Sequence, residues 1–185
     1  MNKIIESALL SALNNYPQIP LIIAYSGGVD SQVLLHTLAK LKYAKKISNR
    51  ITVCHINHGL SANANKWQAF AEQECLKLKL TFVTCEVNVK PKAQHSLEAL
   101  AREARYQALY SLHDEQSLII TGHHRDDQAE TFLLALKRGS GLKGLSAMAS
   151  KINQGKDIIL RPLLNVSRAE IVHLANQQQL KWVED

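Results

Sequence analysis

The stretch Leu21-Ile22-Ile23-Ala24-Tyr25-Ser26-Gly27-Gly28-Val29-Asp30-Ser31 decides the fold of this chain. Its first five residues are apolar or aromatic, as in a buried strand, and the residues from Ser31 onward have a helical pattern. Two adjacent glycines let the backbone curl between them, so that several N–H groups face one hollow at the start of a helix. The segment therefore predicts a strand, a phosphate-binding loop and a helix.

The side chains of this loop point to ATP rather than to a simple anion. Ser26 and Ser31 carry hydroxyls that can donate to the same oxyanion. Asp30 would repel phosphate unless a cation lies between them, and Mg²⁺ is the natural cation. The loop is not a Walker A motif, which has four residues between its glycines and then Lys-Ser/Thr. We predict ATP binding by Ser26, Gly27, Gly28, Val29, Asp30 and Ser31, with Asp30 also a catalytic residue and the Mg²⁺ ligand. An ordinary strand-turn-helix corner with a serine cap is the alternative.

Length and composition predict one α/β domain. The chain has 185 residues, of which 46% are hydrophobic, enough for a single core. No stretch is long and apolar enough to span a membrane, and the first residues lack the apolar segment of a signal peptide. We therefore expect a cytoplasmic protein without a membrane partner. The three cysteines, Cys54, Cys75 and Cys85, form no CxxC pair and are expected to be reduced thiols.

The formal charge is +6, and the basic residues are clustered. One cluster comprises Lys40, Lys42, Lys45, Lys46 and Arg50, and the other comprises Lys137, Arg138, Lys143, Lys151, Lys156 and Arg161. Such clusters suit a polyanion such as nucleic acid, although a solvated basic face explains them nearly as well.

Alternating apolar runs and amphipathic stretches predict a doubly wound parallel sheet of the Rossmann-like kind. The expected strands are 21–25, 51–56, 81–86 and 117–121. The expected helices are 2–15, 31–44, 64–79, 96–112, 125–137 and 167–178. In such sheets ligands bind at the carboxyl ends of the strands, so the residues after each strand indicate the site.

Polar side chains follow three of the four expected strands. After the first comes the glycine loop, after the second come His55 and His58, and after the fourth comes the segment from His123 to Glu130. The four histidines could be a transition-metal site, but no strong ligand spacing such as HExxH is present. We predict instead that His55 and His123 bind ATP and that His58 and His124 contact the second substrate. At least one of the four is expected to be structural.

Three acids crowd one turn of the expected helix 125–137. Asp126, Asp127 and Glu130 repel one another unless a cation lies near, which Mg²⁺ or an amino-group substrate would supply. The simpler interpretation is a capping box, expected to hold in part for Asp126 or Asp127. We predict catalytic roles for Asp127 and Glu130 and a substrate contact for Asp126.

Basic residues complete the candidate site. Arg105 lacks an acid four residues before it and is the predicted phosphate contact, whereas Arg102 follows Glu98 by four residues and suits an ion pair. Arg102 is kept as a substrate candidate. The segment Gly139-Ser140-Gly141-Leu142-Lys143-Gly144 fits GxGxxG but follows a helix, so it is not a dinucleotide fingerprint. We interpret it as a basic loop that closes over a substrate or touches RNA, with Arg138, Ser140 and Lys143 as contacts.

Together these motifs resemble the tRNA(Ile)-lysidine synthetase family. The loop Ser26 to Ser31 resembles the PP-loop of the N-type ATP pyrophosphatases, which thiouridylases, GMP synthetase and asparagine synthetase share. The more specific segments are His123 through Glu130 and Arg138-Gly139-Ser140-Gly141. The remaining matches are 55–60, 101–106, 161–164 and 182–185.

The resemblance implies the adenine-nucleotide α-hydrolase (PP-loop ATPase) fold and a two-step ligation. ATP adenylates the C2 carbonyl oxygen of the wobble cytidine in a CAU-anticodon tRNA(Ile), and free L-lysine then displaces AMP to form lysidine. It implies ATP and Mg²⁺ as cofactors, and we keep a homodimer open. In this scheme Asp127 and Glu130 would hold the lysine ammonium, one of them would take its proton, and Arg105 would steady the α-phosphate.

The family usually continues beyond Trp182-Val183-Glu184-Asp185 into further helices and carboxyl-terminal domains that engage tRNA. We therefore expect residues 1–185 to be the PP-loop catalytic domain of a truncated chain, without the tRNA-binding domains. The alternatives are a tRNA thiolase of the same superfamily, a non-enzymatic nucleotide-binding module and a metal-dependent hydrolase. The cysteine spacing does not favour the thiolase, and the carboxylates do not favour the binding module.

Overall fold

The structure is a computed structural model that describes residues 2–57, 59, 61–87, 97–139, 141 and 148–184. Its helices are α1 (Asn2–Leu13), α2 (Val29–Tyr43), α3 (Ala64–Lys77), α4 (Leu97–Tyr110), α5 (Arg125–Lys137) and α6 (Arg168–Gln177). Its strands are β1 (Leu21–Ala24), β2 (Ile51–Asn57), β3 (Thr81–Glu86), β4 (Leu118–Ile120), β5 (Lys151–Gln154) and β6 (Asp157–Leu160). The predicted α/β class is confirmed, and the bounds of the six predicted helices and four predicted strands agree to within two residues.

The six strands form one sheet in the order β3-β2-β1-β4-β6-β5. All neighbouring pairs are parallel except β5 with β6. Leu21 of β1 pairs with Ile51 on one side and with Leu118 on the other. The chain therefore proceeds outward from β1 through β2 to β3 and then returns to β4 on the opposite side of β1. This reversal places a topological switch point between β1 and β4, where such sheets bind ligands.

Side chains of the sheet alternate between two apolar layers. Leu21 and Ile23 of β1 belong to the larger layer, under α1, α2 and α6, whereas Ile22 belongs to the smaller layer with Leu109 of α4. This alternation follows from the two-residue repeat of a strand. Because both faces are covered, the central strands read as unbroken apolar runs in the sequence.

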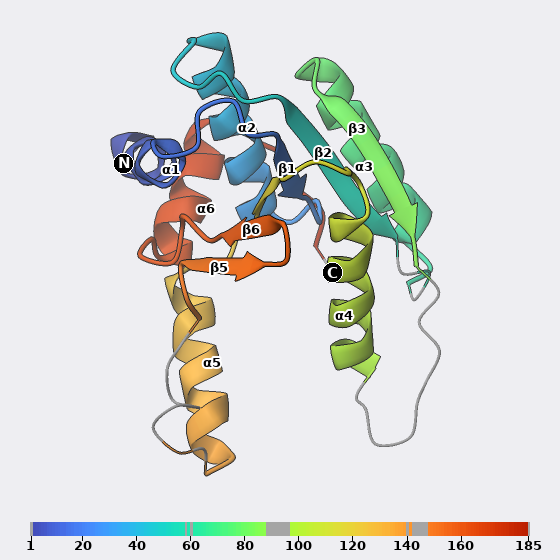
Figure 1. The fold of residues 1–185 in the computed structure, drawn as a ribbon, viewed down its shortest axis with the longest axis vertical. Coiled ribbons are helices and arrows are strands. Elements are labelled where there is room, and N and C mark those ends of the chain that lie inside the picture. The colour runs from blue at the N-terminus through green and yellow to red at the C-terminus, as the bar shows by residue number, and fades with distance from the viewer. Residues whose placement is uncertain are drawn as a thin grey trace.

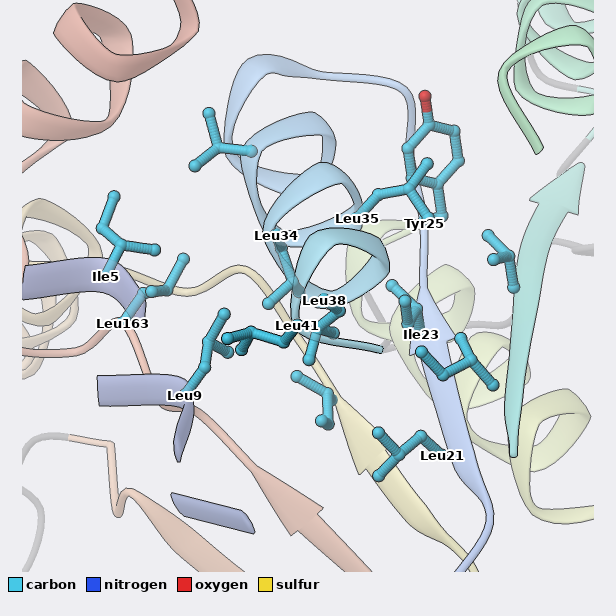
Figure 2. Close-up of a cluster of buried hydrophobic side chains, with 14 of the residues drawn as sticks. Ile5, Leu9, Leu21, Ile23, Tyr25, Leu34, Leu35, Leu38, Leu41 and Leu163 are labelled. Atoms are coloured by element: carbon cyan, nitrogen blue, oxygen red, sulfur yellow. The ribbon is translucent and has the colours of Figure 1, made fainter. Parts of the chain in front are cut away.

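Helix α2 is the centre of the larger layer. Ten of its residues are buried, and Leu34, Leu35 and Leu38 have no exposed surface. Figure 2 shows these side chains and Leu41 packed among residues of α1 and β1 and the residue Leu163. The labelled residues of α1 and β1 are Ile5, Leu9, Leu21 and Ile23. The glycine loop is therefore attached to a deeply buried helix of the core.

The hairpin of β5 and β6 is the main departure from the predicted fold. The sequence from 137 to 161 was expected to be a basic stretch without strands, yet Ile158-Ile159-Leu160 pairs in parallel with β4. Strand β5 pairs antiparallel with β6 at the edge of the sheet. The prediction was wrong because β5 is mostly exposed, with only one apolar residue, and β6 has only three apolar residues in a row.

Helix α5 differs from the other helices, since none of its residues is buried. It extends away from the sheet, as Figure 1 shows for the element labelled α5. Four of its apolar side chains are exposed: Phe132, Leu133, Leu134 and Leu136. Its first turn is nevertheless fixed, because Arg125 N–H donates to Val166 O (2.9 Å) and Gln128 exchanges two hydrogen bonds with the backbone of Met148.

The first basic cluster lies at the carboxyl end of α2 and just beyond it, at the opposite end of this helix from the glycine loop. Lys40 and Lys46 lie 2.6 and 3.8 Å from the carboxylate of Glu6, and Arg50 pairs with Glu115. Much of this cluster is thus neutralised within the fold. No helix in the described part of the chain is both long and apolar enough to cross a membrane.

Candidate active site

A cleft of about 550 Å³ opens at the carboxyl ends of β1, β2 and β4. This volume is within the range of small-molecule sites. Residues from the predicted site line it: Ser26, Asp30, Ser31, His55, Arg105, His123 and Asp127. The prediction that the polar strand ends converge is therefore confirmed for the loops after β1, β2 and β4.

The glycine loop is closed on its own serines. Ser31 Oγ accepts from Gly27 N–H (3.1 Å) and donates to the carbonyl of Gly28 (2.9 Å). Ser26 Oγ accepts from Gly28 N–H (3.3 Å) and lies 3.2 Å from Ser31 Oγ. The backbone donors of the loop thus already point at hydroxyl oxygens, which phosphate oxygens could replace. Helix α2 begins at Val29, two residues before the predicted Ser31.

Gly27 is required by both its conformation and its neighbour. Its φ of +91° lies in the left-handed region, and a Cβ on it would lie 2.8 Å from Val183 Cγ2. Val183 N–H donates to the Gly27 carbonyl (3.0 Å), so the segment 181–184 packs directly on the loop. The fully buried Gln32 donates to the carbonyl of Lys181 (2.8 Å) and to Glu74 (2.8 Å), and it accepts from the Tyr25 hydroxyl (2.6 Å).

The loops after β1 and β4 touch each other at the switch point. A Cβ on Gly122 would lie 3.3 Å from the backbone of Asp30 and Ser31, so only glycine allows this approach without a shift. His124, 5% exposed, brings its Nε2 to 3.4 Å from Asp30 Oδ1. Its Nδ1 lies 3.5 Å from Asp127 and 3.8 Å from Asp126. One imidazole therefore lies between the carboxylate of the glycine loop and the two acids of α5.

The charge state of His124 follows from this setting. Burial acts to lower its pKa, but the carboxylates of Asp30, Asp127 and Asp126 together outweigh burial, and the net pKa is raised. The raised pKa favours the protonated form of His124 beside the acidic cluster, where the sequence had assigned Mg²⁺ or an amine. Its placement between the two segments was not predicted.

The residues present fit a magnesium ion at one position. Asp30 Oδ1 is fully buried and makes no hydrogen bond, and His124 Nε2 lies 3.4 Å from it, so a cation bound at this oxygen would add to the positive charge with which His124 offsets it. Among the residues that the structure describes, no group of three or more His, Cys, Asp or Glu side chains is arranged as a metal site. Asp30 is therefore the predicted Mg²⁺ ligand, with the remaining ligands expected from phosphate and water.

The simpler interpretation of the α5 acids is confirmed in part. Asp127 accepts from the N–H of His124 (2.7 Å), as an acid at the third helical position does in a capping box. Asp126 accepts instead from the N–H of Arg168 (2.8 Å), and so it caps the first turn of α6. Both carboxylates have structural partners, while Asp127 also lines the cleft.

Two histidines of the cleft wall are neutral. Burial lowers the pKa of His55, whose Nδ1 lies 3.1 Å from the Tyr25 carbonyl. Burial and the positive charge of Arg161 lower the pKa of His123 to about 4, and its Nδ1 lies 2.7 Å from Thr121 Oγ1. Neutral imidazoles can contact a nucleotide without adding charge to the site.

Of the two arginines of α4 in the candidate site, one lines the cleft. Arg105 of α4 lines the cleft, whereas Arg102 lies with its guanidinium carbon 5.4 Å from the ring centroid of Tyr106 and does not line it. The predicted ion pair of Arg102 with Glu98 lies outside the described side chains.

The other predicted contacts do not line the cleft where they are described. Glu130 is exposed on α5 and does not line the cleft, and Arg138 lies at the far end of α5. The predicted contacts His58, Ser140 and Lys143 lie outside the described residues.

Three features of the site were missed by sequence reasoning. Arg161 follows β6, is 4% exposed, donates to the Ala149 carbonyl (2.8 Å) and has a buried Nε without a partner. Trp67 of α3 and Tyr106 of α4 line the cleft. The apolar run before Arg161 was the available signal for a fifth parallel strand with a polar end.

A second cleft of about 510 Å³ lies beside the first, on the other side of the glycine loop. Ser26, Asp30 and Trp67 line both clefts, so the two clefts adjoin at these residues. The remaining wall of the second cleft comes from Gly28, Val29, Arg168, Trp182, Val183 and Glu184. The predicted loop residues Gly28 and Val29 thus face the second cleft rather than the first.

Comparisons with known proteins agree with this geometry. The sequence matches the PP-loop domain family over residues 1–185. It is 49% identical over 164 residues to the tRNA(Ile)-lysidine synthase of Actinobacillus pleuropneumoniae serotype 3 (strain JL03), covering 89% of this chain and 37% of that protein. It is 44% identical over 165 residues to the tRNA(Ile)-lysidine synthase of Legionella pneumophila (strain Paris), again covering 89% and 37%. The chain therefore spans well under half the length of these relatives.

Solved structures show the same fold at low sequence identity. A U34-tRNA thiolase from Methanococcus maripaludis, solved with its [4Fe-4S] cluster, superposes with a TM-score of 0.76 at 18% identity, covering 98% of this chain and 65% of that one. An NH3-dependent NAD synthetase from Campylobacter jejuni superposes with a TM-score of 0.60 at 22% identity, covering 96% and 73%. These likenesses support the predicted adenine-nucleotide α-hydrolase arrangement and no particular reaction.

Proposed function

Because the chain belongs to the PP-loop domain family, a family of ATP-using domains, we propose that it is the catalytic part of an enzyme that forms lysidine on tRNA(Ile). The observation that carries this proposal is the contact between two segments at the switch point. The glycine loop after β1 supplies phosphate donors, and the segment after β4 supplies acids that suit an amine. The curated relatives with 44% to 49% identity bear the corresponding name.

In the first step the C2 carbonyl oxygen of the wobble cytidine would attack the α-phosphorus of ATP. The bond from the α-phosphorus to the bridging oxygen breaks, and pyrophosphate leaves with the electron pair. In the second step the ε-amino nitrogen of lysine attacks C2, the bond from C2 to the phosphate oxygen breaks, and AMP leaves. The amine loses its protons in this step, so it needs a base nearby.

The cleft residues suit the first step. Adenosine would lie against His55 and the strand ends, where neutral imidazoles and apolar walls meet. Arg105 would donate to the α-phosphate, because a guanidinium forms paired hydrogen bonds with phosphate oxygens. When bound at Asp30, Mg²⁺ would neutralise charge that develops on the leaving oxygens.

The acids of α5 suit the second step. Asp127 lines the cleft, and Glu130 stands one turn further along the helix. A lysine ammonium that approaches from this side would meet these two carboxylates, and Asp127 is the nearer base for its proton. The pKa of His124 is raised because the three carboxylates outweigh burial, and this favours a protonated imidazole beside Asp127.

We also propose a cytoplasmic location, since the substrates are ATP, free lysine and tRNA.

A homodimer through α5 is proposed on the exposed apolar stripe formed by Phe132, Leu133 and Leu136. Antiparallel pairing of two copies would place the acidic first turn of one helix beside Lys137 and Arg138 of the other. Replacement Leu133→Glu should then reduce the mass measured by analytical ultracentrifugation from dimer to monomer. An unchanged mass would contradict pairing through α5.

The direct test uses the full-length form with ATP, Mg²⁺, labelled lysine and unmodified tRNA(Ile). Label should enter the RNA together with release of one AMP and one pyrophosphate. Asp127→Ala and Glu130→Ala should raise the lysine KM or reduce turnover by roughly tenfold or more, whereas the exposed Asp114→Ala should not. Pyrophosphate release with no label in RNA would contradict lysidine formation.

The thiolase alternative has less support. The thiolase likeness is confined to the fold, at 18% identity. Cys54 and Cys85 lie 4.0 Å apart on β2 and β3, but Cys54 is buried, and burial strongly raises its pKa. A thiol of that kind is a poor nucleophile for sulfur transfer.

A further inference from the structure

The second cleft has a charge pattern of its own. Arg168 is the only cationic residue among the described residues that line it, and Gly28 and Val29 of the glycine loop line the same cleft. The guanidinium is exposed and has no carboxylate partner in the described part of the chain. Asp30 and Glu184 also line this cleft. A cation beside loop N–H groups, with carboxylates nearby, suits an anion that binds together with Mg²⁺.

The backbone of Arg168 is firmly held, so its side chain starts from a fixed position. Its N–H donates to Asp126 (2.8 Å), and Ser167 forms a capping box with Glu170 at the start of α6. Ile171 and Leu174 of the same helix are buried in the large apolar layer, where α6 contacts α2. Arg168 and the glycine loop are therefore mounted on two helices that pack together.

The opposite wall is also fixed to the loop. Val183 N–H donates to the Gly27 carbonyl, and the neighbouring Trp182 lines the cleft with Trp67. Since Ser26 and Asp30 line both clefts, a triphosphate whose α-phosphate lies in the first cleft would extend past these residues into the second. The second cleft is thus the space that the β- and γ-phosphates would enter.

We propose that Arg168 binds the pyrophosphate group directly and holds it in the second cleft both before and after the bond to the α-phosphate breaks. This rests on the proposed cleavage of ATP between its α- and β-phosphates. As the bond to the bridging oxygen breaks, its electron pair stays on the pyrophosphate, and the Arg168 guanidinium donates N–H groups to oxygens whose negative charge has increased. Arg168 was absent from the sequence-predicted site, because α6 carries no motif for phosphate.

The test compares Arg168→Gln with the matched control Arg125→Gln, an exposed arginine at the start of α5 that lines neither cleft. Binding of inorganic pyrophosphate and of AMP is measured with Mg²⁺ by displacement of a fluorescent ATP analogue. Arg168→Gln should weaken pyrophosphate binding roughly tenfold or more and leave AMP binding within about twofold. Arg168→Lys should recover part of the loss, and Arg125→Gln should bind both ligands as the unmodified protein does.

Equal weakening of pyrophosphate and AMP by Arg168→Gln would overturn the proposal, since it would indicate a general loss of structure. Unchanged pyrophosphate binding would overturn it as well. Neither result depends on lysidine formation, because no tRNA or lysine is present. Conversely, the proposed function would fail if no labelled lysine entered tRNA, even if Arg168 bound pyrophosphate as described.

Discussion

Helices α2 and α5 hold the two halves of the candidate site, and they are built in opposite ways. Each follows a central strand and carries a carboxylate of the site in its first turn, Asp30 on α2 and Asp127 on α5. Ten residues of α2 are buried, whereas α5 has none and is held mainly by its first turn. The comparison teaches that the phosphate half of the site is part of the core. The acidic half lies on a helix outside the core, so its local free energy of unfolding can change without a change in the stability of the core.

The largest expected difference between the two helices comes from matched leucine truncations. Leu34→Ala on α2 removes a side chain with 0% exposure and should lower the free energy of unfolding by about 2–5 kcal/mol. Leu134→Ala on α5, with 44% exposure and outside the stripe proposed for pairing, should change it by less than about 0.5 kcal/mol. Urea denaturation of both variants measures the contrast. Similar losses at the two positions would show that α5 is packed as tightly as α2.

The next effect concerns the loop that precedes α2. Gly27→Ala introduces a Cβ 2.8 Å from Val183 Cγ2 at a φ of +91°, and it should cost about 1–3 kcal/mol and weaken ATP binding. Gly155→Ala is the control, since its φ is +58° and nothing lies within 4 Å of the added Cβ. The double variant Gly27→Ala with Val183→Ala should recover the part of the lost stability that comes from the contact between the added Cβ and Val183. If it recovers nothing, backbone strain alone accounts for the loss.

A pH effect should appear at the start of α5. Burial and Arg161 lower the pKa of His123 to about 4 in the folded protein, compared with about 6.5 when unfolded. As the pH falls from 6.5 to 4, the unfolded chain takes up a proton that the folded chain does not. The free energy of unfolding should therefore decrease, by about 1–3 kcal/mol for this group. His123→Gln should flatten that part of the curve, measured by urea denaturation at each pH. An identical pH dependence in the variant would contradict the assignment.

The smallest effect is the loss of one cap between helices. Asp126→Asn weakens the acceptor for the Arg168 N–H and should lower the thermal midpoint by a small but measurable amount. The control is Asp114→Asn, at an exposed loop position. Thermal denaturation followed by circular dichroism is sensitive enough for this comparison. A loss as large as that of Leu34→Ala would mean that α5 supports the core after all.

The sequence predicted β1, β2 and β4, which are largely buried runs in the middle of the sheet, and it also predicted β3, an edge strand without a buried residue. It failed at β5 and β6, where Lys151-Ile152-Asn153-Gln154 lies at the exposed edge and carries one apolar residue. The loops after β1, β2 and β4 were found because parallel strands end at one edge of the sheet. Arg161, Arg168 and the segment 181–184 were not assigned to the site, since their contacts depend on packing between elements distant in the sequence.

The residue types of the site were also easier to predict than the hydrogen-bond and ion-pair partners of those residues. The crowding of Asp126, Asp127 and Glu130 was visible in the sequence, and a cation was expected beside it. The structure supplies part of that charge from His124, and it uses Asp126 to cap α6. Which group pairs with each carboxylate depends on proximity in three dimensions, and residue type and spacing do not give that proximity.

The hydrogen bond from Gln32 to the Lys181 carbonyl joins residues that are 149 positions apart, and Val183 meets Gly27 across a similar separation. During synthesis on the ribosome, the glycine loop emerges long before the segment that packs on it. A nascent chain released at any point before residue 181 would therefore carry the whole loop sequence but lack one wall of its pocket. The ability to retain ATP should consequently arise late in translation and in a single step, when the last described residues leave the exit tunnel.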